Sequence, residues 1–252
     1  MANRAILFLS SLWMILASPA AAAPRELLEI VSSGAGDRTV KALPGRPEVL
    51  SNRQVILHPE ILASGDKDGG PRLPLLDGAV YDLERTGFER RGPDGFVWRG
   101  KVLVPGQTGG SATLTMMGGA MAGVISLPDA LYEIVPVAGG GEGDHLLLEI
   151  APGRFPACGG AELPAIARRA LRAAPETVGK TGTTRIDLLV VYTASAVEAA
   201  GGERPLRVRI QNAVDVANTT FQNSEIDARL NLVHAERIPT WRRTAPTPSC
   251  AG

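Results

Sequence analysis

The 252-residue sequence is poor in aromatic residues and cysteine, and neither sign of charge is in excess. Aromatic residues make up only 4% of the chain, against 29 glycines and 19 prolines, which disfavours a helical bundle and favours many short elements joined by turns. Because 26 basic residues balance 26 acidic ones, there is no general electrostatic attraction to nucleic acid or an acidic membrane. We therefore expect no nucleic acid and no membrane among its partners.

Long apolar runs are also scarce. The main one lies at the start, where Arg4 precedes an apolar stretch over residues 5–17 and the small residues of 20–23 follow. This run is too short to span a bilayer, which argues against a membrane anchor, and it has the composition of an export signal. We predict a signal peptide over residues 1–23, cleaved near Ala23, and a secreted or periplasmic mature protein.

The middle of the chain, residues 24–157, is predicted to be a β-rich domain. Prolines interrupt the short apolar runs of residues 25–80, so little regular structure is expected there. From about 80 to 151, short apolar runs alternate with glycine and proline turn signals, a spacing that predicts an antiparallel sheet. The strands are expected at Phe96–Val104, Ala112–Met116, Met121–Ser126, Leu131–Val137 and His145–Ile150.

The remainder changes character. Residues 158–184 are interrupted by prolines and contain a basic cluster, Arg168, Arg169 and Arg172, which predicts a protease-accessible linker. Residues 185–236 are predicted to form a strand buried on both faces, a helix with apolar residues at helical spacing, and a second strand. Residues 237–252 are predicted to be an irregular tail. The expected fold class is therefore α+β, an antiparallel β-rich domain followed by an incomplete α/β unit.

The strand-helix-strand segment has a familiar sequence. Residues 186–196 (Ile-Asp-Leu-Leu-Val-Val-Tyr-Thr-Ala-Ser-Ala), the helix end Asn-Thr-Thr-Phe-Gln-Asn-Ser and residues 229–234 (Arg-Leu-Asn-Leu-Val-His) resemble the start of a bacterial reprolysin-like metzincin catalytic domain. Upstream, Tyr-Asp-Leu-Glu-Arg at 81–85, Phe-Val-Trp-Arg-Gly-Lys-Val at 96–102 and Arg-Phe-Pro at 154–156 resemble the propeptide of secreted members. The resemblance implies a zinc metalloendopeptidase precursor that acts on proteins or peptides.

The zinc motif of that family is missing. Metzincins bind zinc through His-Glu-x-x-His-x-x-Gly-x-x-His, with the glutamate as general base. The three histidines, His58, His145 and His234, do not fall in this pattern, and we assign no catalytic residue. We expect the chain to be a truncated precursor, inactive as it stands. Zinc is implied by the family, without a complete site.

Cys158 is the one candidate metal ligand. It lies in Pro-Ala-Cys-Gly-Gly, which resembles the cysteine switch of metzincin propeptides, where a thiolate occupies the open zinc position of a complete zymogen. Two alternatives stay open: a structural free thiol, or a disulfide with Cys250, which an oxidising compartment permits. The spacing of the two cysteines does not decide between them.

Other polar residues are interpreted more simply. His145 and His234 are expected to be packing or surface residues, because they have no partners at metal-ligand spacing. Asp187, Glu198 and Asp215 are expected to be solvated carboxylates and not a catalytic pair. Serine hydrolase chemistry at Ser195 is disfavoured, since no Gly-x-Ser-x-Gly elbow surrounds it.

The alternative function is a secreted, non-enzymatic binding or inhibitory module. Residues 185–236 distinguish this function from the peptidase precursor, because a binding module has little need for a remnant of a catalytic domain. We expect that remnant to fold poorly without further chain, since a parallel strand pair is normally covered on both faces.

Overall fold

Nine strands form one antiparallel sheet in the computed structural model, which describes residues 25–31, 46–64, 70–140, 143–155 and 182–239. The sheet order is β1-β2-β9-β8-β7-β6-β5-β4-β3, so most neighbours in the sheet are also neighbours in sequence. The strands are β1 (Leu28–Ile30), β2 (Val49–Leu57), β3 (Arg72–Pro74), β4 (Val80–Arg90), β5 (Phe96–Leu103), β6 (Gly110–Met117), β7 (Ala120–Ser126), β8 (Leu131–Pro136) and β9 (Asp144–Ile150). With helix α1 (Pro59–Ala63) and the 3-10 turn η1 (Pro152–Arg154) they make up what we call the β-module.

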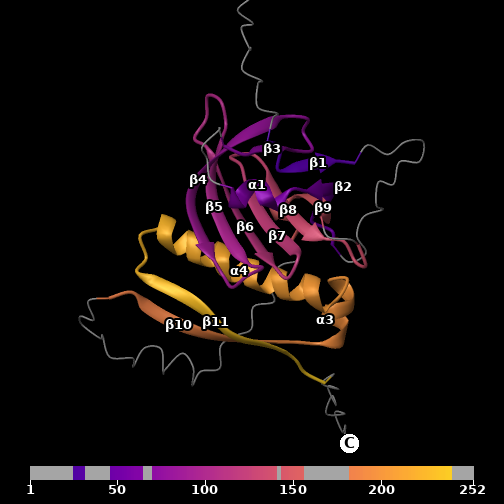
Figure 1. Cartoon of the computed structure of the whole chain (residues 1–252), viewed down its shortest axis with the longest axis vertical. Helices are drawn as coiled ribbons and strands as arrows, with labels where there is room; N and C mark the ends of the chain where they lie inside the picture. Colours follow the sequence, from indigo (N-terminus) through magenta and orange to yellow (C-terminus); the bar gives the residue numbers. More distant parts are fainter. Residues whose placement is uncertain (1–24, 32–45, 65–69, 141–142, 156–181, 240–252) are drawn as a thin grey trace, which may run out of the picture.

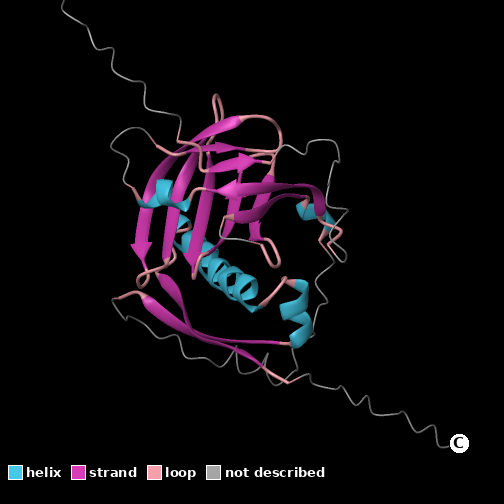
Figure 2. Cartoon of the chain, turned by 45° about the vertical axis from the view of Figure 1, so that its right-hand side comes forward, coloured by secondary structure: helices cyan, strands magenta, loops and turns pink. Residues whose placement is uncertain are grey.

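The rest of the described chain forms a second unit, the α4 unit, of residues 182–239. It contains β10 (Thr184–Tyr192), α3 (Ala194–Ala199), α4 (Glu203–Asn223) and β11 (Ala228–Arg237). Strands β10 and β11 pair in parallel, with a register shift between Leu188 and Leu189. Helix α4 lies between this pair and the β-module sheet, where it contacts β6 and β7 (Figures 1 and 2).

The main hydrophobic core belongs to the β-module alone. Every buried residue of the largest apolar cluster lies between Leu27 and Leu147, including the fully buried Trp98 and Tyr132. The α4 unit contributes far less buried apolar surface, and its buried hydrophobic residues among those described are Tyr192, Val208 and Val214. The β-module therefore has a closed core of its own, whereas the α4 unit does not.

The α+β, β-rich fold class predicted from the sequence is confirmed. Strands β5 to β9 fall where the alternating apolar runs predicted them, and the strand-helix-strand order of residues 184–237 is also observed. The short helix α3 was not predicted. Among the described residues, no helix has the length and apolar character needed to cross a membrane.

Two structural expectations were wrong. Residues 25–80 hold β1, β2, α1 and β3, because the prolines sit where they do little harm: Pro59 opens α1 and Pro74 ends the short β3. Strand β10 is not buried on both faces, since Leu189 is 68% and Val191 52% exposed. The described residues cover only the side of β10 and β11 that faces α4.

Gly100 of β5 gives a test of the core packing. The ring of Trp98 lies where a Cβ at position 100 would stand, so Gly100→Ala forces the buried ring to move. We expect a loss of about 1–3 kcal/mol in unfolding free energy, the usual cost of overpacking. Gly153→Ala is the matched control, because a Cβ there meets nothing within 4 Å. Equal thermal stability of the two variants would contradict this account.

Candidate functional site

Helix α4 carries a row of buried polar residues that bond to the β-module on one side and to β11 on the other. Asn212, Asp215 and Asn218 recur at three-residue spacing, and their residues are only 4%, 0% and 6% exposed. A buried polar side chain is costly unless it is hydrogen-bonded, so each of these needs a partner. All three have partners, and they lie on different elements of the fold.

Asp215 is the most constrained of them. Both of its carboxylate oxygens accept hydrogen bonds from the guanidinium of Arg91, at 2.7 and 2.8 Å, which is the strong bidentate geometry. Thr115 of β6 donates to the same carboxylate at 2.8 Å, and Gln211 donates at 3.3 Å. Arg91 follows β4, so this pair joins the β-module to α4.

The electrostatics of Arg91 follow from this geometry. Burial works against the charged guanidinium, but hydrogen bonding to Asp215 and the charges of Asp215 and Glu89 outweigh it and raise the pKa of Arg91. Arg91 is therefore held as a cation beside a fully buried carboxylate.

Helix α4 makes further contacts with strands β6 and β7 of the β-module. The amide of Asn212 donates to the carbonyl oxygen of Thr113 and to the hydroxyl of Thr115, both at 3.1 Å. Beside them, the fully buried Val208 packs against Ala120 and Ala122 of β7. The contact thus combines one apolar anchor with a row of directional hydrogen bonds.

Asn218 binds α4 to strand β11, on the side of the helix away from the β-module. Its side-chain oxygen accepts from the backbone N–H of Leu230 at 2.7 Å, and its amide nitrogen donates to the Leu230 carbonyl at 2.9 Å. The side-chain amide of Asn218 thus pairs with both the N–H and the C=O of one β11 residue, as the backbone of a neighbouring strand would.

A more exposed ion pair lies near the same contact. Arg229 of β11 donates to both oxygens of Glu89 of β4, at 2.9 and 3.0 Å. Desolvation raises the pKa of Glu89, but the charges of Arg91 and Arg229 outweigh it and leave that pKa lowered. Because the two side chains are 36% and 52% exposed, solvent screening leaves this pair a modest contribution.

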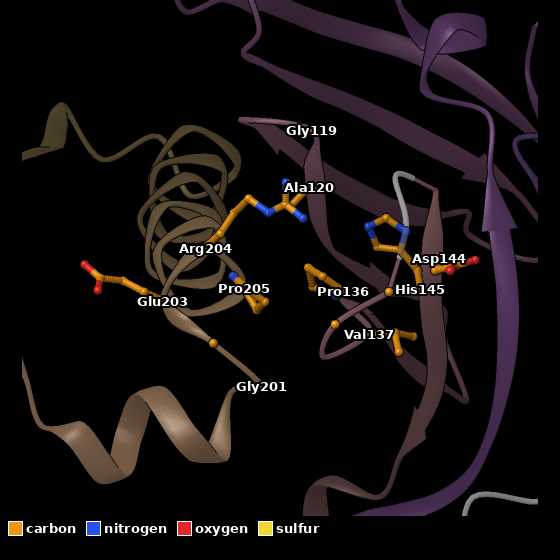
Figure 3. A pocket seen from close by; sticks show the side chains of 13 residues that line it. Gly119, Ala120, Pro136, Val137, Asp144, His145, Gly201, Glu203, Arg204 and Pro205 are labelled. Atoms are coloured by element: carbon orange, nitrogen blue, oxygen red, sulfur yellow. The ribbon is translucent and has the colours of Figure 1, made fainter.

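A small hollow of about 230 Å³ opens beside the first turn of α4 (Figure 3). Arg204 reaches across toward Gly119 and Ala120, whereas Glu203 points away from the hollow (Figure 3). His145, at its wall, is engaged at both ring nitrogens: Nδ1 donates to the Gly143 carbonyl and Nε2 accepts from the Met121 N–H. Both ring nitrogens of His145 are thus occupied by backbone groups.

The residues considered as metal ligands are not brought together. His58 lies beside Glu60, His145 is buried, and His234 is exposed beside Glu236. Cys158 and Cys250 lie outside the described residues. Within the described ranges there is no group of three or more histidine, cysteine, aspartate or glutamate side chains that could hold a metal ion, so these residues do not fit a zinc site.

One expectation about carboxylates was wrong. Asp187 is solvated, as predicted, and bonds Arg185 and Asn231 at the surface. Asp215, expected to be solvated, is fully buried. The three-residue spacing of Asn212, Asp215 and Asn218 was the signal available in the sequence, because it places successive polar residues close together on the helix surface. Arg91, the main partner of Asp215, gave no signal.

Comparison with known proteins gives one partial relative. A segment of 69 residues is 38% identical to a peptidyl-Asp metalloendopeptidase of Pseudomonas aeruginosa and covers 27% of this chain but only 10% of that protein. The chain thus matches about a tenth of the length of this curated relative. No family model and no solved structure matches it. The chain is therefore distantly similar, in part, to a metal-dependent peptidase.

Removing Arg91 tests the buried pair. Arg91→Ala leaves the carboxylate of Asp215 buried without its main partner, and we expect a loss of about 3–5 kcal/mol in unfolding free energy. Arg154→Ala, which removes an exposed arginine, is expected to change stability by less than about 0.5 kcal/mol. Chemical denaturation of both variants measures the difference, and similar values for the two would show that the pair stabilises nothing.

His145 gives a pH dependence. Burial lowers its pKa below the ordinary 6.5, against smaller opposing effects of the Gly143 hydrogen bond and Asp144. The neutral ring is thus favoured in the fold, so its contribution is present above about pH 6.5 and lost as the pH falls from there through the lowered pKa. Denaturation at several pH values should show a stability loss below pH 6.5 that His145→Gln reduces. Parallel curves for the two proteins would exclude this role.

Proposed function

We propose that the chain contains the propeptide and the first strand-helix-strand unit of a secreted zinc metalloendopeptidase precursor. The observation that carries this proposal is the 69-residue segment that is 38% identical to a metalloendopeptidase. The parallel pair β10–β11 with α4 between its strands supports it, because this is the arrangement that the reprolysin-like resemblance implies. The β-module takes the place of the propeptide.

The catalytic centre must come from residues outside this sequence. No His-Glu-x-x-His occurs in the 252 residues, and the described residues do not fit a zinc site. We therefore propose that the chain by itself does not hydrolyse peptides. Export through the signal peptide of residues 1–23, and cleavage between the two units near Arg168, Arg169 and Arg172, belong to the same proposal.

Cys158 keeps its proposed role only within this framework. Its thiolate is the candidate for occupying the zinc of a complete zymogen, and its position shortly after the β-module is consistent with a propeptide segment. The alternatives named above, a structural thiol or a bridge to Cys250, are resolved by mapping disulfides in the secreted protein by mass spectrometry.

The proposal is tested first by sequencing the DNA downstream of the gene and then by a peptidase assay of purified protein. Translating all frames of the DNA downstream of the Gly252 codon should reveal His-Glu-x-x-His-x-x-Gly-x-x-His. A protein with that region joined in frame should cleave protein substrates in a chelator-sensitive manner, whereas the 252-residue chain should not. Because the relative is named for peptidyl-Asp specificity, the panel should include peptides with aspartate and matched peptides with asparagine.

Two results would contradict the proposal. One is the absence of the zinc motif in every downstream frame, and the other is a joined protein that folds but shows no chelator-sensitive hydrolysis. Replacing the motif glutamate by glutamine in the joined protein is the control, because it removes the general base and keeps the metal ligands.

The second candidate is a secreted binding or inhibitory module. The closed core of the β-module favours it, since residues from Leu27 to Leu147 form the main apolar cluster without the α4 unit. A residue 25–155 fragment that is stable and is recovered with one specific secreted protein would support this function. Failure of that fragment to fold would exclude it.

A further inference from the structure

The contact between the β-module and the α4 unit differs in kind from the core beside it. We infer that the β-module is a specific, separable binder of the α4 helix, and that the two units stay associated when the backbone between residues 155 and 182 is cut. The inference does not depend on the peptidase assignment, because it rests only on the contacts between the two units.

The first reason is how the apolar surface is divided. The main core includes no residue after Leu147, whereas the apolar part of the contact is a small cluster of Ala120, Ala122 and Val208 with Met117 packed against it. A contact with little apolar surface and many polar partners resembles an interface between associating domains more than a shared core. Such an interface is able to assemble from two chains.

The second reason is the specificity of the polar contacts. Arg91 binds Asp215 with two hydrogen bonds, and Thr113 and Thr115 bind Asn212 three residues away on the same helix. These bonds fix both the rotation of α4 about its axis and its position along it. The surface therefore selects a helix with asparagine and aspartate three residues apart and a β-branched anchor one turn earlier.

The third reason is the dependence of the α4 unit on this surface. Its parallel strand pair covers one side of α4, and the β-module covers the other (Figures 1 and 2). Loss of the β-module would leave Asp215 and Asn212 without their β-module partners. A cut in the connecting chain removes none of these contacts, so association should persist.

The test starts from the full chain with a site for a sequence-specific protease inserted between residues 155 and 182. After complete cleavage, size-exclusion chromatography and native mass spectrometry should find both pieces in one 1:1 complex. The complex should persist in 0.5 M NaCl, because a buried ion pair is screened far less than a surface pair. Separate elution, precipitation of the C-terminal piece alone, or dissociation in 0.5 M NaCl would overturn the inference.

Substitutions then locate the binding energy. Asp215→Asn should raise the dissociation constant of the cut complex on the order of 100-fold, because it removes the buried carboxylate charge that the guanidinium of Arg91 binds with two hydrogen bonds. Asp227→Asn is the matched control: it removes an exposed carboxylate of the same unit and should leave binding unchanged. Equal binding by both variants would overturn the assignment of Asp215.

A double variant distinguishes loss of the Arg91–Asp215 pair from general misfolding of the single variants. Arg91→Gln combined with Asp215→Asn replaces the ion pair by two neutral groups and leaves no buried charge unpaired. It should weaken the cut complex less than the two single changes together, measured by a dilution series. Strictly additive effects would show that the two residues do not act as a pair, and would overturn the inference.

Discussion

The placement of helix α4 depends on one fully buried carboxylate. Asp215 loses all contact with water, and a desolvated charge is tolerated only where its partners are close and well oriented. Arg91 supplies two hydrogen bonds and Thr115 a third, so the charge is stabilised only when the segment after β4, strand β6 and α4 are all in place. This requirement joins a local ion pair to the relative arrangement of the two units.

The same constraint explains why α4 carries few buried apolar residues. A helix between two sheets normally buries apolar residues on both sides, yet here Asn212 and Asp215 face the β-module and Asn218 bonds to β11. Directional bonds give less stability than apolar burial but allow one position and one rotation only. The helix is therefore specified in register by polar contacts and anchored by Val208.

The sequence predicted the elements better than their contacts. Strands β5 to β9 were readable because alternation and glycine or proline turns are local signals, and the helix of residues 203–223 followed from its periodicity. Strands β1 to β3 were missed because proline was weighed by its number and not by its position at the ends of elements. Asp215 was misjudged because its partner Arg91 lies 124 residues away, and no local pattern records such a pairing.

The described part of the chain leaves one face of the β10–β11 pair uncovered. Leu189, Val191 and Val233 are more than half exposed, although parallel pairs are normally buried on both faces. Helix α4 covers one face, and the polar residues that hold it to the β-module do nothing for the other. This face is mixed in character, because Leu189 and Val191 lie beside the exposed His234 and Glu236 of β11. Under the proposed function, further chain of a catalytic domain would cover Leu189 and Val191, whereas a free-standing binding module would leave these two side chains exposed.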